Sequence, residues 1–495
     1  MARNRADAAN GLAALRKSGR AMAFMLAALL AVTGCATADR PALPSAAVGV
    51  EVWLTTPDRS ALLEPQSPLA LSAGSAPAPA IVVDPAERFQ EMVGFGAAVT
   101  DASAYLIERR MDPDQRAALM RNLFGPAPGI HLSFTRITVG ASDFSRSHYS
   151  YDDRPMGDTD PELDHFSIAP ARETVLPTVR AARAINPELA VMISPWSAPG
   201  WMKTGDSLIQ GTLRETAYAP FADYMRRTIQ AFAADGVPAD YLSIQNEPDF
   251  EPDSYPGMRL SAAQRARIIG DHVGPALRAA GIATEILDWD HNWDQPEQPL
   301  GVLADPAAAP YVAGVAWHCY GGDVGAQTMV HERYPEKDVF FTECSGGEWS
   351  AAWPDAWSWM LRNLIVGTTR NWARGVLLWN LALDERHGPH LGGCDTCRGV
   401  VTIDSETGAV TRNPEYYALG HVSAFVRRGA RRIASDSPVA GVENVAFLNP
   451  DGSRVMLAFN AGEAPADLTV TAEGRHFTYR LPAKAAATFR WHEPR

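Results

Sequence analysis

Apolar runs of seven to nine residues recur along the middle of the chain, separated by longer amphipathic stretches. Each run is short and nearly continuous in apolar side chains, which is typical of a strand buried on both faces. Eight such strands are predicted, at residues 91–99, 131–139, 189–196, 240–246, 283–290, 312–320, 338–345 and 375–382.

Helical patterns fill the intervals between these runs. The stretch 221–236 ends on a glycine, and 261–281 begins on a serine and ends on a glycine, as helices commonly do. Buried strands that alternate with amphipathic helices predict a parallel sheet covered on both faces. Eight repeats favour a closed (β/α)8 TIM barrel of the α/β class, over residues 89–414, rather than an open doubly wound sheet.

The two flanks of this region show the alternating pattern of half-buried strands. It appears at 48–56 and again at 442–460 and 467–491, where Asn449, Pro450, Asp451 and Gly452 supply a turn. The N-terminal strands are too few to form a domain alone. We therefore expect residues 48–88 and 415–495 to combine into one β-sandwich beside the barrel.

The first 35 residues have the anatomy of an export signal. Basic residues precede an apolar run at 21–32 that is too short to span a bilayer. The following "VTGC" resembles a bacterial lipobox, which predicts Cys35 as the lipidated first residue and residues 36–47 as a tether. Ordinary signal cleavage within 36–38 is the alternative. The lipobox predicts an exported outer-membrane lipoprotein that faces the periplasm or cell surface and meets the membrane only through its lipid.

Composition narrows the range of partners. The chain has 495 residues, 46% hydrophobic content and a net charge of −13. Its folded part carries one dense basic run, at 425–432, so a nucleic-acid partner is not expected. We find no P-loop, and the run "GFGAAV" (94–99) lacks the third glycine of a dinucleotide fingerprint. We therefore predict no organic cofactor and no metal.

Polar, acidic and aromatic side chains stand where the predicted strands end: Asp143, Trp196, Asn246, Glu247, Trp289, Asp290, His318, Tyr320, Glu343, Trp379 and Asn380. Barrel enzymes act at the carboxyl ends of their strands, so these side chains should share one rim. Glu247 and Glu343 are 96 positions apart, about three β/α units, and should face each other across the barrel mouth.

Paired carboxyls across a cleft are what glycosidic bond hydrolysis requires. One is protonated and donates to the leaving oxygen, while the other is ionised and attacks the sugar or activates water. Trp196 and Trp379 suit the apolar face of a sugar ring, and Asp143 and Asn246 could take its hydroxyl groups. A single glutamate after a strand is more often an ordinary loop residue, and a tryptophan there is more often core. The combination favours a glycosidase.

Several motifs carry a family resemblance: "VGFGAAVTDASA" (93–104), "RITVGASDFS" (136–145), "SPWSAPGWMKT" (194–204), "SIQNEP" (243–248), "FFTECSGG" (340–347) and "LLWNLAL" (377–383). Together they resemble glycoside hydrolase family 30, the family of acid glucosylceramidase, from about residue 48 to the C-terminus. The resemblance implies a barrel with a side sandwich. It also implies a retaining double displacement in which Glu247 is the acid/base and Glu343 the nucleophile, with carboxyl groups about 5–5.5 Å apart.

The same resemblance assigns the surrounding residues. It implies that Asn246 holds the sugar 2-hydroxyl and that Asp143, Trp196 and Trp379 line the glucose subsite. Arg136, His318 and Tyr320 would support Glu343, with His318 and Tyr320 also counted among the substrate-binding residues. Arg136 has a rationale of its own, because a guanidinium keeps a nearby carboxylate ionised.

The loop at 385–401 departs from the glucosylceramidase pattern. His387, His390, Cys394 and Cys397 have the composition of a zinc site. An exported chain meets oxidising conditions, however, so we favour a Cys394–Cys397 disulfide over zinc. His390 is expected to face the substrate. For Cys319 and Cys344, at the ends of adjacent strands, buried reduced thiols are favoured slightly over a second disulfide.

The expected substrate is a β-linked glucoside, as an oligosaccharide or a glycolipid. The family resemblance implies that similar cysteine-containing loops occur in members that act on glucans, so endo-β-1,6-glucanase action is an alternative, and β-xylosidase or xylanase action is another. A noncatalytic sugar-binding lipoprotein is least favoured, because both carboxyls are present.

Overall fold

The computed structural model describes residues 49–493. Its centre is a closed barrel of eight parallel strands, in the order β10-β11-β13-β5-β6-β7-β8-β9. Their bounds are β5 (Gly94–Ala98), β6 (Phe134–Val139), β7 (Ala190–Pro195), β8 (Tyr241–Ser243), β9 (Glu285–Asn292), β10 (Val312–His318), β11 (Asp338–Glu343) and β13 (Ala373–Asn380). All eight predicted strands are present, and the predicted TIM barrel is confirmed.

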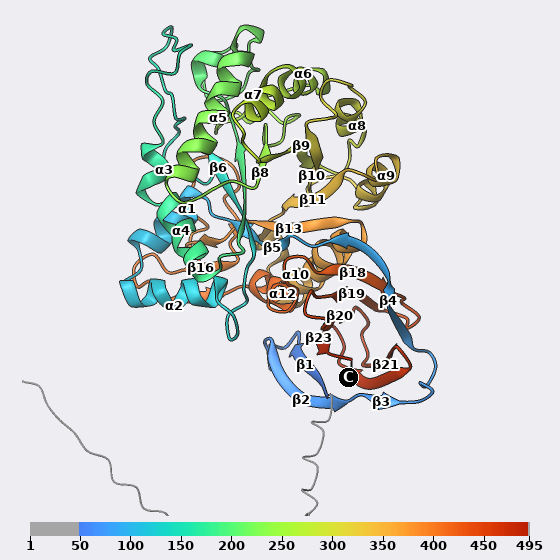
Figure 1. Cartoon of the computed structure of the whole chain (residues 1–495). Coiled ribbons are helices and arrows are strands. Elements are labelled where there is room, and N and C mark those ends of the chain that lie inside the picture. Colours follow the sequence, from blue (N-terminus) through green and yellow to red (C-terminus); the bar gives the residue numbers. More distant parts are fainter. Residues whose placement is uncertain (1–48, 494–495) are drawn as a thin grey trace, which may run out of the picture. The chain divides into compact units, whose positions relative to one another are not determined.

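Helices cover the outside of the barrel (Figure 1). They include α1 (Asp101–Arg109), α2 (Pro113–Phe124), α3 (Ala169–Glu173), α4 (Val175–Ile185), α5 (Tyr218–Ala234), α6 (Ala262–Arg267), α7 (Gly274–Ala279), α8 (Glu297–Leu303), α9 (Gly325–Arg333), α10 (Trp353–Trp359) and α11 (Thr368–Arg370). The helix predicted from Ser261 begins with a capping box between Ser261 and Gln264. A π-helical segment, Ile268–Val273, joins α6 to α7.

A layer of apolar side chains fills the barrel interior below the carboxyl ends of the strands. Phe134, Tyr241 and Phe340 meet there, with ring centroids 4.7–5.9 Å apart. Gly375 makes room for this layer, since a Cβ atom at that position would lie 2.6 Å from the Phe134 ring. Solvent is thereby kept from the lower barrel, and the polar strand ends are left as the upper surface of the core.

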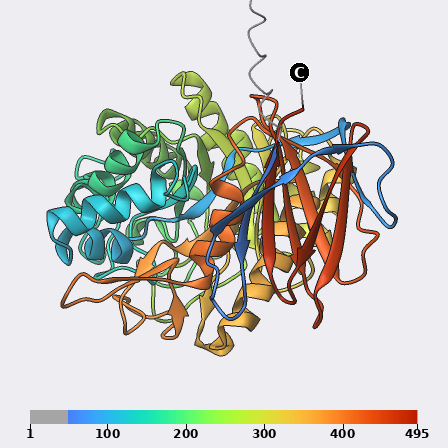
Figure 2. The same ribbon diagram turned by 90° about the horizontal axis from the view of Figure 1, so that it is seen from below.

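The remaining strands form a second, largely antiparallel β structure built from both ends of the chain. Its order is β2-β1-β23-β20-β19-β18-β4-β21-β22-β3. The strands are β1 (Gly49–Thr55), β2 (Glu64–Ala70), β3 (Ser72–Ala73), β4 (Ile81–Glu91), β18 (Arg431–Ser435), β19 (Val442–Leu448), β20 (Arg454–Asn460), β21 (Ala466–Ala472), β22 (Arg475–Leu481) and β23 (Ala486–Trp491). Figure 2 shows the N-terminal strands, in blue, running beside the C-terminal strands, in red.

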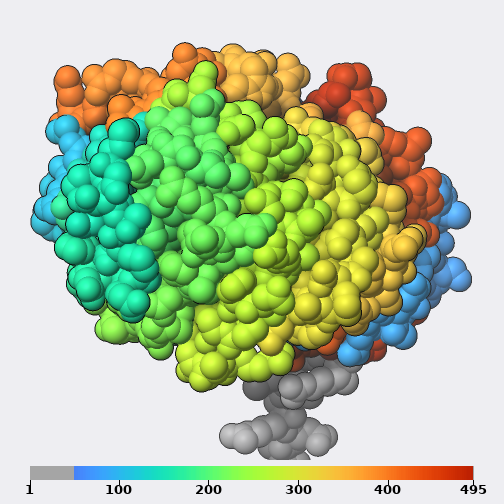
Figure 3. All heavy atoms as spheres, turned by 90° about the horizontal axis from the view of Figure 1, so that it is seen from above, coloured from blue at the N-terminus to red at the C-terminus, as the bar shows by residue number. Residues whose placement is uncertain are grey.

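This sheet folds over its own apolar core, as a sandwich does. Phe477 of β22 packs on Phe489 and Trp491 of β23, with ring centroids 5.1 and 5.6 Å apart. The predicted turn joins β19 to β20, where the Gly452 amide donates to Asn449 O. The prediction that N- and C-terminal strands share one side domain is therefore confirmed. In the space-filling view of Figure 3, blue and red atoms from the two ends of the chain meet on one flank.

Helix α12 (Pro414–Ser423) connects the barrel to the side sheet, and every one of its residues is buried. The His421 ring lies between Thr55 of β1 and Thr488 of β23, with ring nitrogens 2.9 and 2.8 Å from their hydroxyl oxygens. At the other side, Ser423 donates to Ile130 O. The helix therefore contacts both parts of the fold with hydrogen-bonded polar groups.

The predicted signal, lipidation site and tether at residues 1–47 lie outside the described residues. Within 49–493, every helix is too short or too polar to cross a bilayer.

Candidate active site

The "SIQNEP" segment leaves β8 in a backbone conformation that turns Glu247 into the barrel mouth. The Asn246 amide donates to Pro195 O at the end of β7, and the Glu247 amide donates to Asp290 O on β9. Glu247 itself has φ +46°, in the left-handed region that non-glycine residues seldom occupy. Neighbouring strands on both sides thus hold a strained residue, an arrangement often found at functional sites.

Glu343 is the last residue of β11 and is 5% exposed. Both of its oxygens accept hydrogen bonds: Oε2 lies 2.5 Å from Arg136 Nη1, and Oε1 lies 3.0 Å from the Tyr320 hydroxyl. Two donors, one of them charged, fix the plane of this carboxylate and favour its ionised form.

Arg136 is fully buried in the centre of the strand ends. Besides Glu343, its Nη2 atom donates to Asp290 Oδ2 at 2.6 Å and to Asn246 Oδ1 at 2.7 Å. Its guanidinium also lies 4.7 Å from the Trp196 ring centroid. Burial opposes its charge, but Asp290 and Glu343 outweigh burial and raise the pKa of Arg136. Arg136 therefore remains a cation and connects the ends of four strands, β6, β8, β9 and β11.

His318 lies behind Glu247 rather than beside Glu343. Its Nδ1 atom is 3.0 Å from Glu247 Oε1, and its Nε2 atom is 3.0 Å from Asp290 Oδ1. The ring is completely buried and does not line the cleft, which corrects the expectation that it binds substrate directly. Burial lowers its pKa, but the carboxylates of Glu343, Asp290 and Glu247 reverse this effect and raise it to about 9.

Asp290 anchors this network without entering the cleft. Burial would raise its pKa, but Arg136, His318 and a hydrogen bond from Thr342 hold it far below its usual value. Asp290 is thus a permanent anion, and it stabilises positive charge on both Arg136 and His318.

The two glutamate carboxyls are close enough to titrate as a pair. Burial and the charge of Glu247 raise the pKa of Glu343, although His318 and Arg136 pull it down. For Glu247 the balance is reversed, because the hydrogen bond from His318 and the nearby imidazoles outweigh burial and lower its pKa. In the free protein, a proton therefore resides mainly on His318, within hydrogen-bonding distance of Glu247.

Both carboxyls open into a cleft of about 820 Å³, in the upper part of the range typical of ligand sites. Its wall contains Asp143, Trp196, Gln210, Asn246, Glu247, Phe250, Glu251, Pro252, Asp253, Ser254, Tyr255, His291, Asn292, Tyr320, Glu343, Ser345, Trp349, Trp379, Gly393, Cys394 and Cys397. The structure thus brings together seven of the predicted residues, Asp143, Trp196, Asn246, Glu247, Tyr320, Glu343 and Trp379. Arg136 and His318 lie directly beneath them.

Trp196 and Trp379 lie side by side at the cleft. Their rings are stacked with centroids 4.9 Å apart and an interplanar angle of 17°. Asp143 stands nearby with Oδ1 unpaired among the described residues. Burial and the charges of Glu343 and Glu247 raise the pKa of Asp143 to about 8, so it can donate a hydrogen bond at neutral pH.

The loop after β13 closes over Asp143. The Leu391 amide donates to Asp143 O, and Gly393 has φ +73° and packs so closely that a Cβ would lie 2.5 Å from Asp143 Cβ. Cys394 and Cys397 form a disulfide in this loop, the pairing favoured over zinc from the sequence. The loop therefore forms one fixed wall of the cleft.

His390, like His318, was predicted to contact substrate but does not line the cleft. Its Nδ1 atom is 2.9 Å from Gly392 O, and its ring packs 5.7 Å from Phe144. This placement corrects the expectation that His390 faces the substrate. Gly393 and Cys394 reach the cleft instead, because the loop turns at Gly392.

A second disulfide joins Cys319 to Cys344, contrary to the expectation of reduced thiols. Parallel pairing places His318 opposite Glu343, so the next residues of β10 and β11 have Cα atoms 5.5 Å apart. This separation lies within the range that a disulfide spans.

Three large aromatic residues of the cleft were not predicted. Phe250 and Tyr255 lie in the loop after β8, and Trp349 lies in a short 3-10 helix, Glu348–Ser350; Phe250 and Trp349 are 46% and 60% exposed. Phe250 follows Glu247 by three residues, and Trp349 follows Glu343 by six. This proximity along the chain was the available signal.

Glu247, His291 and His318 are the described residues whose donor atoms converge as a metal site requires, within 4.8 Å of one another. His291 Nδ1 is 3.7 Å from Glu247 Oε1 and has no hydrogen-bond partner among the described residues. An ion at this position would bind the Glu247 carboxylate oxygen that faces His318. Metal binding there would therefore compete with proton transfer through Glu247.

Comparison with known proteins agrees with this arrangement. The chain matches the glycosyl hydrolase family 30 TIM-barrel domain over residues 92–426 and the family's β-sandwich domain over 429–489. It is 38% identical to an endo-1,6-β-D-glucanase of Neurospora crassa, over 76% of this chain and 80% of the relative. It is 28% identical to the lysosomal acid glucosylceramidase of Mus musculus, over 83% of each.

Among solved structures, an endo-β-1,6-glucanase superposes with a TM-score of 0.83 at 33% identity, covering 90% of this chain and 100% of that chain. Sequence and structure thus agree over both parts of the fold, and the chain belongs to glycosyl hydrolase family 30.

Proposed function

We propose that the protein hydrolyses β-glucosidic bonds with retention of configuration, using Glu343 as the nucleophile and Glu247 as the acid/base. One observation carries this assignment. A buried carboxyl, Glu343, and a partly buried one, Glu247, enter one cleft with different partners, since Glu343 accepts from Arg136 and Tyr320 while Glu247 faces His318. Such an asymmetric pair can attack with one member and transfer a proton with the other.

In the first half of the reaction, an ionised Glu343 oxygen attacks the anomeric carbon. The bond from that carbon to the leaving oxygen breaks, and Glu247 gives the leaving oxygen a proton. Arg136 and Tyr320 hold the attacking carboxylate in place, which reduces the ordering needed in the transition state.

The second half returns the enzyme to its starting state. Glu247, now ionised, takes a proton from water as the water oxygen attacks the anomeric carbon and the bond to Glu343 breaks. The product keeps its β configuration because each of the two displacements inverts the same carbon.

His318 supports the proton balance of Glu247. With a pKa of about 9 it is protonated at neutral pH, and its Nδ1 atom lies 3.0 Å from Glu247 Oε1. A proton can therefore pass from the imidazolium to Glu247 as the leaving oxygen gains negative charge. Asp290 keeps this proton available by stabilising the imidazolium from its other side.

The glucose unit would lie against the tryptophan pair. Arg136 already donates a hydrogen bond to the side-chain oxygen of Asn246. The side-chain nitrogen of Asn246 is therefore the group left to donate to the sugar 2-hydroxyl. Asp143 is buried and unpaired at Oδ1, and so suits a sugar hydroxyl.

For the substrate class we propose a β-1,6-linked glucan. Fungal endo-1,6-β-glucanases are 35–38% identical to the chain, whereas glucosylceramidases of Caenorhabditis elegans and Mus musculus are 28–31% identical. The cleft wall also carries hydrogen-bonding groups such as Gln210, Glu251, Asp253 and Asn292, which suit a polyhydroxylated chain better than the alkyl chains of ceramide. The xylanases among the similar structures are at most 21% identical and indicate only the shared fold.

A comparison of substrates tests this proposal. The purified protein is incubated with β-1,6-gluco-oligosaccharides, glucosylceramide in detergent and xylo-oligosaccharides, and kcat/KM is measured for each. The gluco-oligosaccharides should be cleaved most efficiently. Preference for glucosylceramide would refute the β-1,6-glucan proposal and favour glucosylceramidase action. Preference for xylo-oligosaccharides, or no cleavage of either glucoside, would refute the β-glucoside assignment.

Export and lipid anchoring at Cys35 remain predictions from the sequence. An outer-membrane position would bring the enzyme into contact with extracellular polysaccharide. Metabolic labelling with a fatty acid, comparing the wild type with Cys35→Ala, tests the anchor directly.

A further inference from the structure

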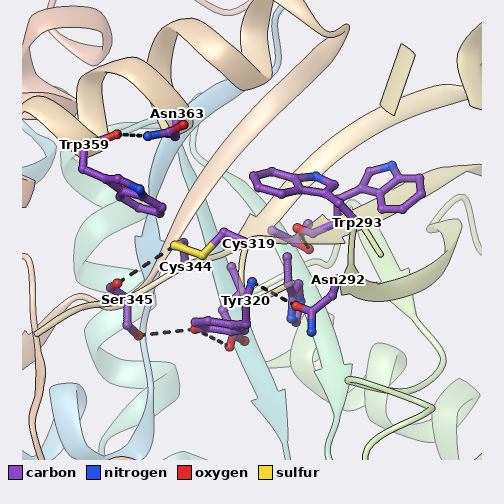
Figure 4. Close-up of a disulfide and its surroundings, with 12 residues drawn as sticks. Asn292, Trp293, Cys319, Tyr320, Cys344, Ser345, Trp359 and Asn363 are labelled. Carbon is purple, nitrogen blue, oxygen red and sulfur yellow. Dashed lines mark hydrogen bonds between the residues drawn. A yellow bond between two sulfur atoms is a disulfide. The ribbon is translucent and has the colours of Figure 1, made fainter. Parts of the chain in front are cut away.

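The Cys319–Cys344 disulfide lies directly beside the catalytic groups. Cys319 stands between His318 and Tyr320, and Cys344 follows Glu343. The ladder between β10 and β11 ends at the pair His318 and Glu343, so the disulfide joins the two strands one residue beyond their last paired position. Figure 4 shows the bridge between Tyr320 on one side and the Trp359 region on the other.

Tyr320 follows this junction directly along the chain. It lies past the end of β10, the residue is 48% exposed, and its hydroxyl nevertheless reaches Glu343 Oε1 at 3.0 Å. Toward β9, the segment is tied by hydrogen bonds, from the Tyr320 amide to Asn292 Oδ1 and from the Trp293 amide to Gly321 O. Toward β11, the disulfide supplies the covalent tie.

The interior end of the bridge is held firmly. Cys344 is 1% exposed, and the Trp379 amide donates to Cys344 O. Cys344 is therefore a fixed point of the barrel rim, and the disulfide transmits its position to the segment that carries Tyr320.

We propose that the Cys319–Cys344 disulfide positions Tyr320 on the nucleophile Glu343 and thereby sets both the orientation and the acidity of that carboxylate. The inference rests on the proposed role of Glu343. A hydrogen bond to an ionised carboxylate favours ionisation, so an intact bridge keeps Glu343 reactive at lower pH. With the bridge open, Tyr320 is free to leave Oε1, and Glu343 takes up a proton more readily. Cys319 and Cys344 act as positioning residues and take no part in the chemical step.

The second disulfide supplies a matched control. Cys394 and Cys397 are three positions apart in one loop, and neither is adjacent to a residue that donates to Glu343. Opening that bridge can alter the cleft wall and hence KM. Opening it should not change the pH at which Glu343 ionises.

The test compares pH profiles of kcat/KM on an aryl β-glucoside. In Cys319→Ala/Cys344→Ala, the acidic limb should move to higher pH by roughly half a unit or more. At the pH optimum kcat should fall by about ten- to a hundredfold, with a smaller change in KM. Tyr320→Phe should shift the same limb in the same direction, and combining it with the cysteine changes should add little. Cys394→Ala/Cys397→Ala should keep the acidic limb of the wild type.

A reduction experiment covers the case in which the double variant does not fold. In the Cys394→Ala/Cys397→Ala protein, the remaining bridge is opened with a dithiol, which supplies two electrons and two protons and becomes a cyclic disulfide. Alkylation and mass spectrometry confirm that Cys319 and Cys344 are free. If the acidic limb of the pH profile is unchanged when this bridge is open, the inference is overturned. If the limb moves to higher pH on reduction and moves back on reoxidation, the inference is supported. Failure of the proposed function is a separate result, seen as activity that persists in Glu343→Gln.

Discussion

Arg136 and Glu343 form a buried ion pair in which Nη1 lies 2.5 Å from Oε2, with the guanidinium side chain fully buried and the carboxylate 6% exposed. The same guanidinium donates to Asp290 and Asn246, so one cation aligns Glu343, the proposed nucleophile, with Asp290 and with the amide proposed to bind the sugar. Removing one partner of such a pair leaves an uncompensated buried charge.

Arg136→Lys tests this relationship. Lysine keeps the charge but lacks the planar group that reaches three acceptors at once. We expect kcat/KM on an aryl β-glucoside to fall on the order of 10²–10³-fold, as when one donor to a catalytic oxygen is lost. Thermal unfolding measured alongside separates this effect from loss of the fold. A folded variant with kcat/KM close to that of the wild type would contradict the role of Arg136.

Glu247→Gln should separate the two halves of the reaction. Glutamine cannot donate the acid proton, so hydrolysis should slow by roughly 10²–10⁴-fold for a glucoside with a poor leaving group. Glucosides whose leaving group needs no proton should still form the intermediate. Added azide, which needs no general base, should then speed turnover and give the β-glucosyl azide. Uniform loss across leaving groups, without azide rescue, would argue against an acid/base role.

The pH profile of kcat/KM should be bell-shaped. On the acidic side, activity requires ionised Glu343, whose pKa is raised by burial and by the charge of Glu247, so this limb should lie above the ordinary glutamate value of 4.5. On the basic side, activity requires the proton shared by His318 and Glu247, and His318 has a pKa of about 9. His318→Asn should lower the pH at which the basic limb begins. A basic limb unchanged in that variant would show that His318 does not hold the proton.

His421 predicts a pH dependence of folding that is independent of catalysis. Burial lowers its pKa from 6.5 to about 3, so the folded protein keeps it neutral while the unfolded chain takes up a proton below pH 6.5. Stability from this group is therefore present above pH 6.5 and is lost as pH falls toward 3, by about 1.4 kcal/mol per pH unit.

His421→Gln isolates this contribution. The free energy of unfolding, measured in urea at several pH values, should fall less steeply with acid in the variant than in the wild type. The two curves should run parallel above pH 7. Equal slopes for both proteins between pH 6 and 4 would contradict the assignment.

The barrel could be predicted from the sequence because its strands are buried on both faces and read as continuous apolar runs. Strand ends then located Glu247 and Glu343, since carboxyl ends of parallel strands share one rim. The loops lacked such a pattern. Nothing periodic fixes the loop around His390, whose ring turns toward Phe144, and the aromatic residues Phe250 and Trp349 follow no strand end directly.

The Cys319–Cys344 bridge shows why register cannot be obtained from apolar patterning alone. The pairing of β10 with β11 shifts between Trp317 and His318, and this irregularity determines which residues stand opposite each other. A pattern of buried residues places both cysteines near the rim. Only the register brings their Cα atoms to 5.5 Å.

Trapping the covalent intermediate would identify the nucleophile. The protein is incubated with a 2-deoxy-2-fluoro-β-glucoside carrying a good leaving group, which slows release of the glycosyl-enzyme, and is then digested and analysed by mass spectrometry. If Glu343 is the nucleophile, one fluoroglucosyl group per chain should be found, attached to Glu343. A label on another residue, or hydrolysis of an ordinary β-glucoside with inversion and no label, would contradict this assignment.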